Sequence, residues 1–209
     1  MSEKPSAPAT ERNRDAILEV LRDELREFST VLEIGSGTGQ HAVYFSDMMP
    51  WLDWQTSDRL VNHAGIDAWI AESSLRNVRR PLDLDVQAPS PLTEVYDAVF
   101  SANTAHIMSF AAVVCMFELV GRLLRLDGVF CLYGPFNLEG KFTSASNETF
   151  DRSLRSQDPN MGIRDLESLQ ELGRDNRMQL LRRYAMPANN MLLVWTRSDQ
   201  SEGVGRDEA

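Results

Sequence analysis

Residues 31–39 read Val-Leu-Glu-Ile-Gly-Ser-Gly-Thr-Gly, which is an apolar strand with an acidic residue followed by a turn with three glycines. Glycine has no Cβ, so such a turn lets the backbone approach a ligand closely. Residues 40–49 then follow the pattern of a helix that Pro50 ends. The first N–H groups of this helix would point toward a ligand at the turn. The stretch therefore predicts a strand–turn–helix unit, with or without a ligand.

The spacing of the glycines separates the ligands that such a turn can hold. A dinucleotide-binding turn reads Gly-x-Gly-x-x-Gly, but here Gly35, Gly37 and Gly39 alternate and Gln40 takes the position of the third glycine. No Gly-Lys-Ser/Thr follows, which excludes a Walker A loop. Glu33 would repel a pyrophosphate and attract a cationic ligand. Spacing and charge both disfavour NAD.

The composition describes an ordinary globular protein. The chain has 209 residues, of which 43% are hydrophobic and 25% charged, which suits one domain with a full core. Its net charge of −10 argues against a nucleic-acid partner. The start of the chain has no apolar run typical of a signal peptide, and no segment is apolar enough to span a bilayer. We therefore expect a cytoplasmic protein without a membrane partner. The sequence predicts no metal site and gives no oligomeric state.

Apolar segments alternate with helical patterns along the first two thirds of the chain. We expect strands at 31–34, 52–57, 78–84, 96–102 and 129–133, and helices at 13–28, 40–49, about 66–71 and 110–126. Such alternation is typical of a doubly wound parallel sheet. After two more helices, at 147–155 and 165–174, strands at 178–185 and 191–196 flank a short turn and predict an antiparallel hairpin. We expect one domain over 1–197 with an extended arm at 1–9, and a disordered tail at 198–209.

Polar residues at the ends of the expected strands are candidates for a ligand site, because ligands of open α/β sheets bind at the carboxyl ends of the strands. Asp58 can accept hydrogen bonds from both hydroxyls of a ribose, or cap the following helix. Asn103 follows the fourth strand and can donate or accept. His106 has an ordinary pKa that suits a general base, or it caps the next helix.

The run from Glu33 to Gly39 resembles motif I of the class I S-adenosylmethionine-dependent methyltransferases, Glu/Asp-x-Gly-x-Gly-x-Gly. The resemblance implies a Rossmann-like α/β fold with a seven-stranded sheet, five strands being parallel and two forming the hairpin. It also implies S-adenosylmethionine as cofactor, with these contacting residues: Glu33, Gly35, Ser36, Gly37, Gly39, Asp58, Asp85, Val86 and Asn103. Of these, Asp85 and the Val86 N–H would meet the adenine, although Asp83 is a rival, and Asn103 would border the methionine part.

Further segments resemble a narrower group, the methyltransferase-like family first catalogued as a domain of unknown function, which includes the human methyltransferase-like protein 26. They cover nearly the whole chain: 6–9, 12–13, 33–41, 54–58, 132–136, 144–147, 162–166 and 186–190. Arg12 and Asn13 precede a helix that can fold over the cofactor cleft, which makes them candidates on the substrate side. Tyr133 ends the fifth strand, where its hydroxyl could orient a substrate. A surface role for Arg12 and a core role for Tyr133 are the alternatives.

The resemblance implies methyl transfer to an O, N or S nucleophile of a small-molecule substrate. This transfer is a displacement at a carbon that the sulfonium already activates, so the protein mainly orients the reactants and excludes water. His106 would act as base only if the nucleophile arrives protonated. Two alternatives stay open: a non-catalytic cofactor-binding scaffold that acts through a protein partner, and an NAD-dependent oxidoreductase, which the glycine spacing disfavours.

Overall fold

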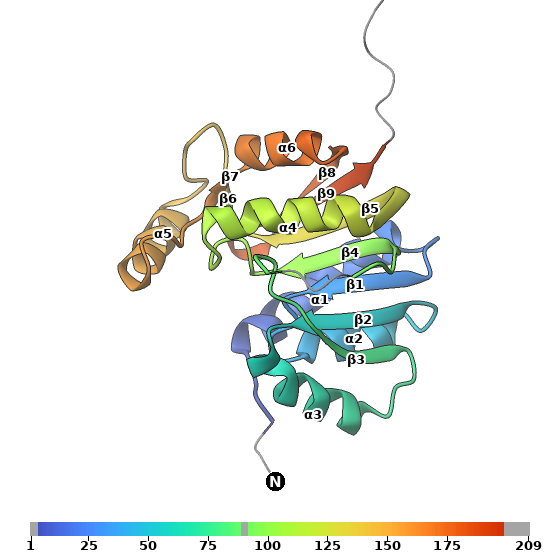
Figure 1. Cartoon of the computed structure of the whole chain (residues 1–209). Coiled ribbons are helices and arrows are strands. Elements are labelled where there is room, and N and C mark those ends of the chain that lie inside the picture. Colours follow the sequence, from blue (N-terminus) through green and yellow to red (C-terminus); the bar gives the residue numbers. More distant parts are fainter. Residues whose placement is uncertain (1–3, 89–91, 199–209) are drawn as a thin grey trace, which may run out of the picture.

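The computed structural model describes residues 4–88 and 92–198, and its centre is a seven-stranded sheet with helices on both faces (Figure 1). The strand order is β3-β2-β1-β4-β5-β9-β8. The strands are β1 (Thr30–Ile34), β2 (Asp53–Asp58), β3 (Val78–Asp83), β4 (Tyr96–Ala102), β5 (Leu124–Gly134), β8 (Met178–Met186) and β9 (Asn190–Arg197). The helices are α1 (Pro8–Glu24), α2 (Gln40–Met48), α3 (His63–Ser73), α4 (Phe110–Leu123), α5 (Ala145–Gln157) and α6 (Leu166–Asp175), with short 3-10 turns at Leu60–Asn62 and Pro187–Asn189.

Strand pairing confirms the predicted α/β fold. β1 pairs in parallel with β2 and β4, and the parallel pairing continues to β3 and β5 on either side. β9 runs antiparallel to both β5 and β8, as the predicted hairpin requires. After β1 the chain adds β2 and β3 on one side and then crosses back to β4 on the other side of β1. The strand order therefore reverses between β1 and β4. Ligands of open α/β sheets bind at such a point.

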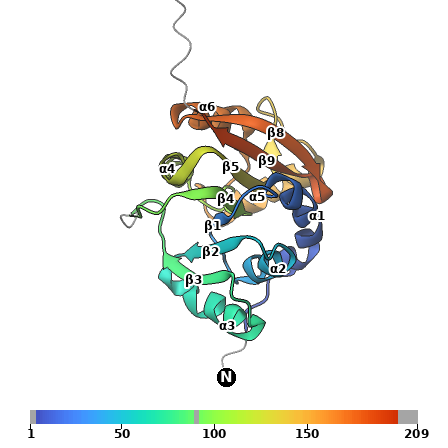
Figure 2. The ribbon, with the colours of Figure 1, turned by 90° about the vertical axis from the view of Figure 1, so that its right-hand side faces the viewer.

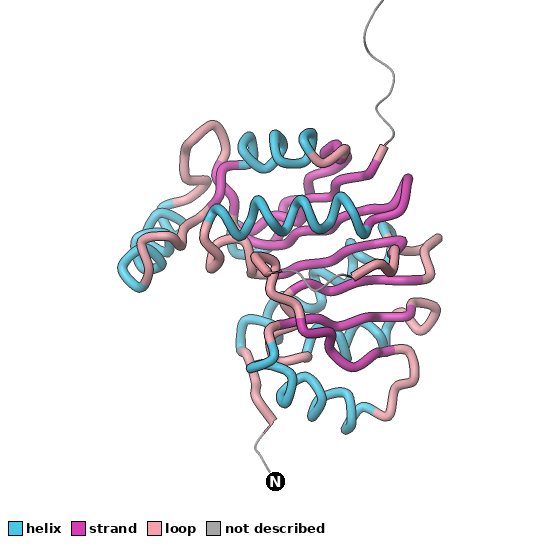
Figure 3. Tube along the Cα trace, viewed as in Figure 1, coloured by secondary structure: helices cyan, strands magenta, loops and turns pink. Residues whose placement is uncertain are grey.

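Two apolar layers hold the helices to the sheet. α4 and α6 cover one face, where Phe117, Phe130 and Trp195 pack together. α1 and α2 cover the other face around Phe45 and Trp54. Figure 2 shows α1 and α2 on the opposite side of the sheet from α4, and Figure 3 shows the strands as the layer between them. Burial on both faces explains why the central strands read as continuous apolar runs.

Element boundaries differ from the expected ones by up to five residues. The helix expected over 13–28 ends at Glu24, and the largest other differences are at the start of α1 and at the junction of α4 and β5. α1 begins at Pro8, five residues before the expected Asn13, because proline at the first helical position has its φ preset for a helix. The last two residues of the expected extended arm are therefore helical. α4 ends at Leu123 and β5 begins at Leu124, whereas a helix to residue 126 was expected. Asp127 has a φ of +60°, so the helix cannot pass through this point.

A small parallel pair of strands lies outside the main sheet and was not predicted. It joins β6 (Phe136–Asn137) to β7 (Arg164–Asp165), and each strand is too short to leave a periodic pattern. The expected tail at 198–209 lies outside the described residues except for Ser198, and the single domain over 1–197 stays a prediction. Within the described ranges, no helix has the length and apolar character needed to cross a membrane.

Candidate functional site

The glycine turn connects β1 to α2 and is tied to the end of β2. The N–H groups of Gly35 and Ser36 both donate to the Ser57 carbonyl at 3.0 Å. Gly35, Gly37 and Gly39 have φ angles of +76°, +58° and +89°, a region that disfavours residues with a Cβ. The three glycines therefore fix a sharp turn at the carboxyl edge of the sheet.

The three glycines have different surroundings. A Cβ on Gly35 would lie 2.7 Å from Cγ2 of Thr104, and one on Gly39 would lie 3.0 Å from the Cα of Ile66 in α3. A Cβ on Gly37 would have nothing within 4 Å. Gly35 and Gly39 thus allow close packing inside the protein, and Gly37 presents open backbone.

A cleft of about 920 Å³ lies at the carboxyl ends of the central strands, at the point where strand order reverses. Its size falls in the range of small-molecule sites. Seven of the predicted cofactor residues line it: Gly35, Ser36, Gly37, Asp58, Asp85, Val86 and Asn103. Gly39 and Glu33 do not, since Gly39 packs against α3 and Glu33 faces the interior.

Asp58 is held in place by three hydrogen bonds from neighbouring segments. Its Oδ2 accepts from the Gly37 N–H at 2.7 Å, and its Oδ1 accepts from the Arg59 N–H at 2.7 Å and from Nδ2 of Asn62 at 2.8 Å. The carboxylate thus supports both the glycine turn and the start of the segment after β2. It also lines the cleft. The capping alternative is wrong, because the N-caps of the 3-10 turn and of α3 are Arg59 and Asn62, without a side-chain cap hydrogen bond.

The ends of β3 and β4 contribute the next residues. Asp85 lines the cleft, and its Oδ1 accepts from the Gln87 N–H at 3.0 Å, whereas its rival Asp83 does not line the cleft. β3 ends at Asp83, so Asp85 lies in the loop after the strand. Asn103 has a φ of +59° and donates its N–H to the Tyr133 carbonyl at 2.9 Å, which turns the chain away from β4 at the cleft.

Glu33 is 2% exposed and its side chain is already bonded inside the protein. Its Oε2 accepts from the Ser36 hydroxyl at 2.8 Å and from Nε1 of Trp54 at 3.2 Å. The pKa of the Glu33 carboxyl is raised to about 7, mainly by burial and in part by the nearby charge of Asp58, against the two hydrogen bonds, which lower it. Glu33 therefore lies beneath the glycine turn and can act on a ligand through Ser36 and through its charge.

The predicted catalytic residues do not line the cleft. His106 is 6% exposed, and its ring packs edge-on against Phe150 at 5.3 Å between centroids. Burial, and then the charge of Arg164, lower the pKa of His106 to about 4, so its imidazole is neutral at physiological pH. Tyr133 is also buried, with its hydroxyl beside Asn13 and Asn190, and burial raises its pKa.

The two predicted substrate-side residues have different environments. Arg12 is exposed and does not line the cleft. Asn13 is buried, and its Oδ1 lies 2.8 Å from Nε2 of His41. His41 itself lines the cleft, and its pKa is lowered to about 4 mainly by burial. His41 was not predicted as a site residue, because its contact with Asn13 of α1 is a tertiary one.

The start of the chain covers one side of the cleft, which sequence reasoning indicated only in general terms. Pro5, Ala7, Ala9 and Thr10 line it. The Ala7 N–H donates to Oε1 of Gln40 at 2.6 Å, and Nε1 of Trp69 donates to the Pro5 carbonyl at 2.7 Å. The Lys4 ammonium lies 3.5 Å from the centre of the Trp69 ring. We call residues 4–7 the arm; it is fastened to α2 and α3.

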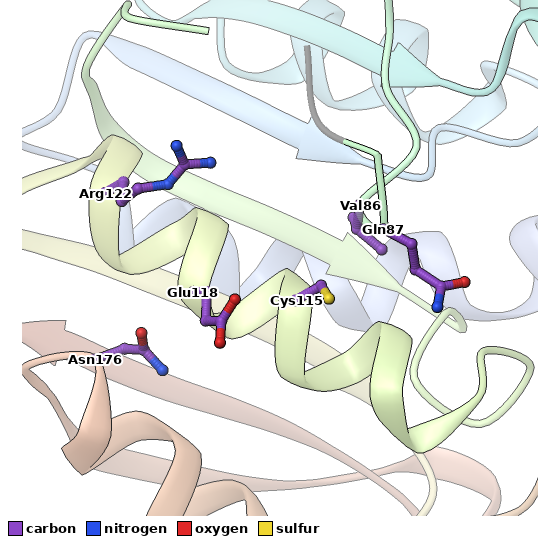
Figure 4. A pocket seen from close by; sticks show the side chains of 6 residues that line it. All are labelled: Val86, Gln87, Cys115, Glu118, Arg122 and Asn176. Carbon is purple, nitrogen blue, oxygen red and sulfur yellow. The ribbon is translucent and has the colours of Figure 1, made fainter. Parts of the chain in front are cut away.

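A smaller pocket of about 490 Å³ lies beside the cleft, between α4 and the loop after β3 (Figure 4). Val86 and Gln87 border both spaces, and Cys115, Glu118 and Arg122 come from one face of α4. It contains neither the glycine turn nor Asp58. The chemical features of a cofactor site therefore lie in the larger cleft.

Comparison with known proteins agrees with this architecture. The sequence profile of a family described as "Protein of unknown function (DUF938)" matches residues 4–197. The S-adenosylmethionine-dependent methyltransferase SibL in its apo form has a TM-score of 0.77 at 18% identity over 91% of this chain, and an O-methyltransferase family protein from Burkholderia thailandensis has a TM-score of 0.78 at 14% identity over 91%. The chain spans 56% and 57% of those two proteins. For YcgJ from Bacillus subtilis the TM-score is 0.69 at 17% identity, and the match covers 92% of this chain and 100% of that protein. The fold is that of the methyltransferases.

Proposed function

This chain belongs to the DUF938 family of proteins of unknown function, and we propose that it is an S-adenosylmethionine-dependent methyltransferase that acts on an O, N or S nucleophile of a small molecule. One observation carries the proposal: the open backbone of Gly37, bonded to Asp58, lies in a cleft at the strand-order reversal of a methyltransferase fold. The resemblance to the human methyltransferase-like protein 26 belongs to this proposal as well.

The charges of the cleft fit this cofactor better than a dinucleotide. Three carboxylates line it, Asp58, Asp85 and Asp158, against one guanidinium, that of Arg59. Such a lining repels a pyrophosphate and attracts a ligand with a cationic sulfonium and ammonium. When bound, S-adenosylmethionine supplies the methyl group to be transferred. In this proposal Asp58 binds the ribose, Asp85 and Val86 the adenine, and Asn103 borders the methionine part.

Orientation and exclusion of water are the main contributions that we assign to the protein. His106 and Tyr133 are proposed to act on the acceptor only in a minor role, because neither lines the cleft and His106 has a low pKa. A base with a pKa near 4 is a weak proton acceptor at neutral pH, which favours a nucleophile that attacks through a free lone pair. If His106→Ala leaves methyl transfer unchanged while the cofactor still binds, His106 has no role as base.

A small-molecule acceptor is part of the proposal, since the net charge of −10 disfavours binding to nucleic acid. A cytoplasmic location is part of the proposal as well. The second candidate, a cofactor-binding scaffold without catalysis, is favoured by one observation: the predicted catalytic side chains lie outside the cleft lining.

Calorimetry with S-adenosylmethionine, S-adenosylhomocysteine and NAD tests the cofactor. We expect binding of the first two and none of NAD; tight binding of NAD alone would overturn the proposal. Incubation with a methyl-labelled donor and a metabolite extract then tests catalysis. Label in a small molecule supports the enzyme, and cofactor binding without any transfer supports the scaffold.

A further inference from the structure

The side of the cleft opposite the arm is a wall made by two loops. The loop after β4 contributes Ile107, Met108 and Ser109, and the loop after α5 contributes Asp158 and Met161. Neither loop belongs to the main sheet, so something else must hold them at the cleft. We call residues 104–109 and 158–161 the wall.

The side chain of Arg164 in β7 joins the two loops. Its Nε donates to the Ala105 carbonyl at 3.0 Å, and its Nη2 donates to the carbonyl of Met108 and to that of Asn160, the latter at 2.8 Å. Two of these acceptors belong to the first loop and one to the second. A planar guanidinium with donors in a fixed fork can join carbonyls in this way, which a single ammonium does less well.

The buried charge of Arg164 has no carboxylate partner. The residue is 8% exposed and forms no ion pair with any residue of the described ranges 4–88 and 92–198. The nearby Asp151 instead bonds to Nε of Arg155 at 2.7 Å and to the Ile163 N–H at 2.8 Å. Burying a charge costs free energy unless it is hydrogen-bonded, so the carbonyls of the wall stabilise this guanidinium, together with the ring of Phe110, whose centre lies 5.9 Å from its Cζ. The wall and Arg164 therefore depend on each other.

A backbone contact strengthens the same junction. The Gly162 N–H donates to the His106 carbonyl at 2.9 Å, and Gly162 has a φ of +152°. A residue with a Cβ is strained at this φ, so the position favours glycine. Residues 162 and 164 thus attach the loop after α5 to three carbonyls of the loop after β4, those of Ala105, His106 and Met108.

We propose that Arg164 is a positioning residue that holds the acceptor side of the cleft, so that Ile107, Met108 and Met161 form a fixed apolar surface for the methyl acceptor. This inference rests on the proposed function. Arg164 does not line the cleft and acts through the backbone of the two loops. Loss of the fork should loosen the wall and misplace the acceptor, while the glycine turn and Asp58 still bind the cofactor.

The test compares Arg164→Lys with Arg152→Lys, a matched change at an exposed arginine of α5 that pairs only with Glu148. Hydrogen exchange, read by mass spectrometry, should rise about tenfold or more in the wall for Arg164→Lys and stay unchanged for Arg152→Lys, because hydrogen bonds from a charged donor are lost. The affinity for S-adenosylhomocysteine should change less than about threefold, and transfer of label to the metabolite extract should fall about tenfold or more.

Arg164→Ala with added guanidinium ion provides a second measurement. Partial recovery of transfer at millimolar guanidinium is expected, and it would not follow from a general loss of stability; should this variant fail to fold, the lysine comparison decides. Unchanged exchange and transfer in Arg164→Lys, with S-adenosylhomocysteine bound, would overturn the role of Arg164 alone. If the unaltered protein does not bind S-adenosylhomocysteine, the proposed function fails and the assignment of the wall to an acceptor fails with it.

Discussion

Oδ2 of Asp58 accepts a 2.7 Å hydrogen bond from the backbone N–H of Gly37, which joins the end of β2 to the glycine turn after β1. Both residues line the cleft, one in the turn after β1 and the other at the end of β2, which pairs with β1. The carboxylate therefore fixes the turn at the place where we propose that it binds a ribose.

Replacement of Asp58 should weaken cofactor binding. Asp58→Ala removes a charged acceptor whose hydrogen bonds contribute about 1.5–3 kcal/mol each, so the affinity for S-adenosylhomocysteine should fall at least about tenfold in calorimetry. Asp83→Ala is the control, because Asp83 is the register partner of Asp58 in β3 but lies outside the cleft lining. Equal affinities in the two variants would contradict a role of Asp58 in binding.

Gly37 and Gly39 should respond differently to the same substitution. Both have positive φ, so alanine costs about 1–2 kcal/mol at either position. Only at Gly39 does the new Cβ also meet the backbone of Ile66, at 3.0 Å. We expect Gly39→Ala to lower the melting temperature clearly more than Gly37→Ala, and Gly37→Ala to weaken S-adenosylhomocysteine binding more. The opposite order in either measurement would show that Gly37 is not the glycine that presents open backbone to the cofactor.

The burial of Glu33 makes stability depend on pH. Its folded pKa of about 7 lies above the ordinary value of 4.5, so the folded protein holds a proton that the unfolded chain has already lost between these values. The contribution of Glu33 to stability is complete below pH 4.5 and is lost as pH rises through about 7. Urea denaturation of the unaltered protein and of Glu33→Gln at pH 5 and pH 8 tests this.

From pH 5 to pH 8, the free energy of unfolding of Glu33→Gln relative to that of the unaltered protein should increase by up to about 3 kcal/mol. Glutamine keeps an oxygen that can accept from Trp54 and Ser36, so the comparison changes mainly the charge. A stability difference that is the same at both pH values would mean that Glu33 is ionised in the folded protein throughout this range.

The strands of the main sheet could be predicted because their signals are local. The apolar run at 96–102 is β4, and the short turn at 186–190 separates the two antiparallel strands. The end of α4 could not be predicted, because Leu124 continues a helical pattern, although it pairs with Tyr96 as the first residue of β5. Tertiary contacts override helix propensity there.

The candidate site also contains some residues that could be predicted from the sequence and others that could not. Asp58, Asp85 and Asn103 could be found because a parallel sheet brings the carboxyl ends of its strands to one edge. Met161 and Pro5 also line the cleft, but their places depend on contacts between distant parts of the chain: Arg164 bonds to the loop after β4, and Trp69 bonds to the Pro5 carbonyl. His106 was predicted beside the cleft from its position after β4, and its side chain instead packs against Phe150 of α5.

The arm should slow release of the cofactor. Trp69 holds it through the 2.7 Å hydrogen bond to the Pro5 carbonyl, and Trp69→Phe removes this bond while it keeps an aromatic ring beneath Lys4. A neutral hydrogen bond contributes about 0.5–1.5 kcal/mol, so labelled S-adenosylmethionine chased with excess S-adenosylhomocysteine should dissociate about three- to tenfold faster. Trp51→Phe is a matched control, since its Nε1 donates to the Leu25 carbonyl at 3.2 Å and Trp51 does not line the cleft. Equal dissociation rates in both variants would mean that the arm does not restrain the cofactor, and that its contacts with α2 and α3 serve the fold alone.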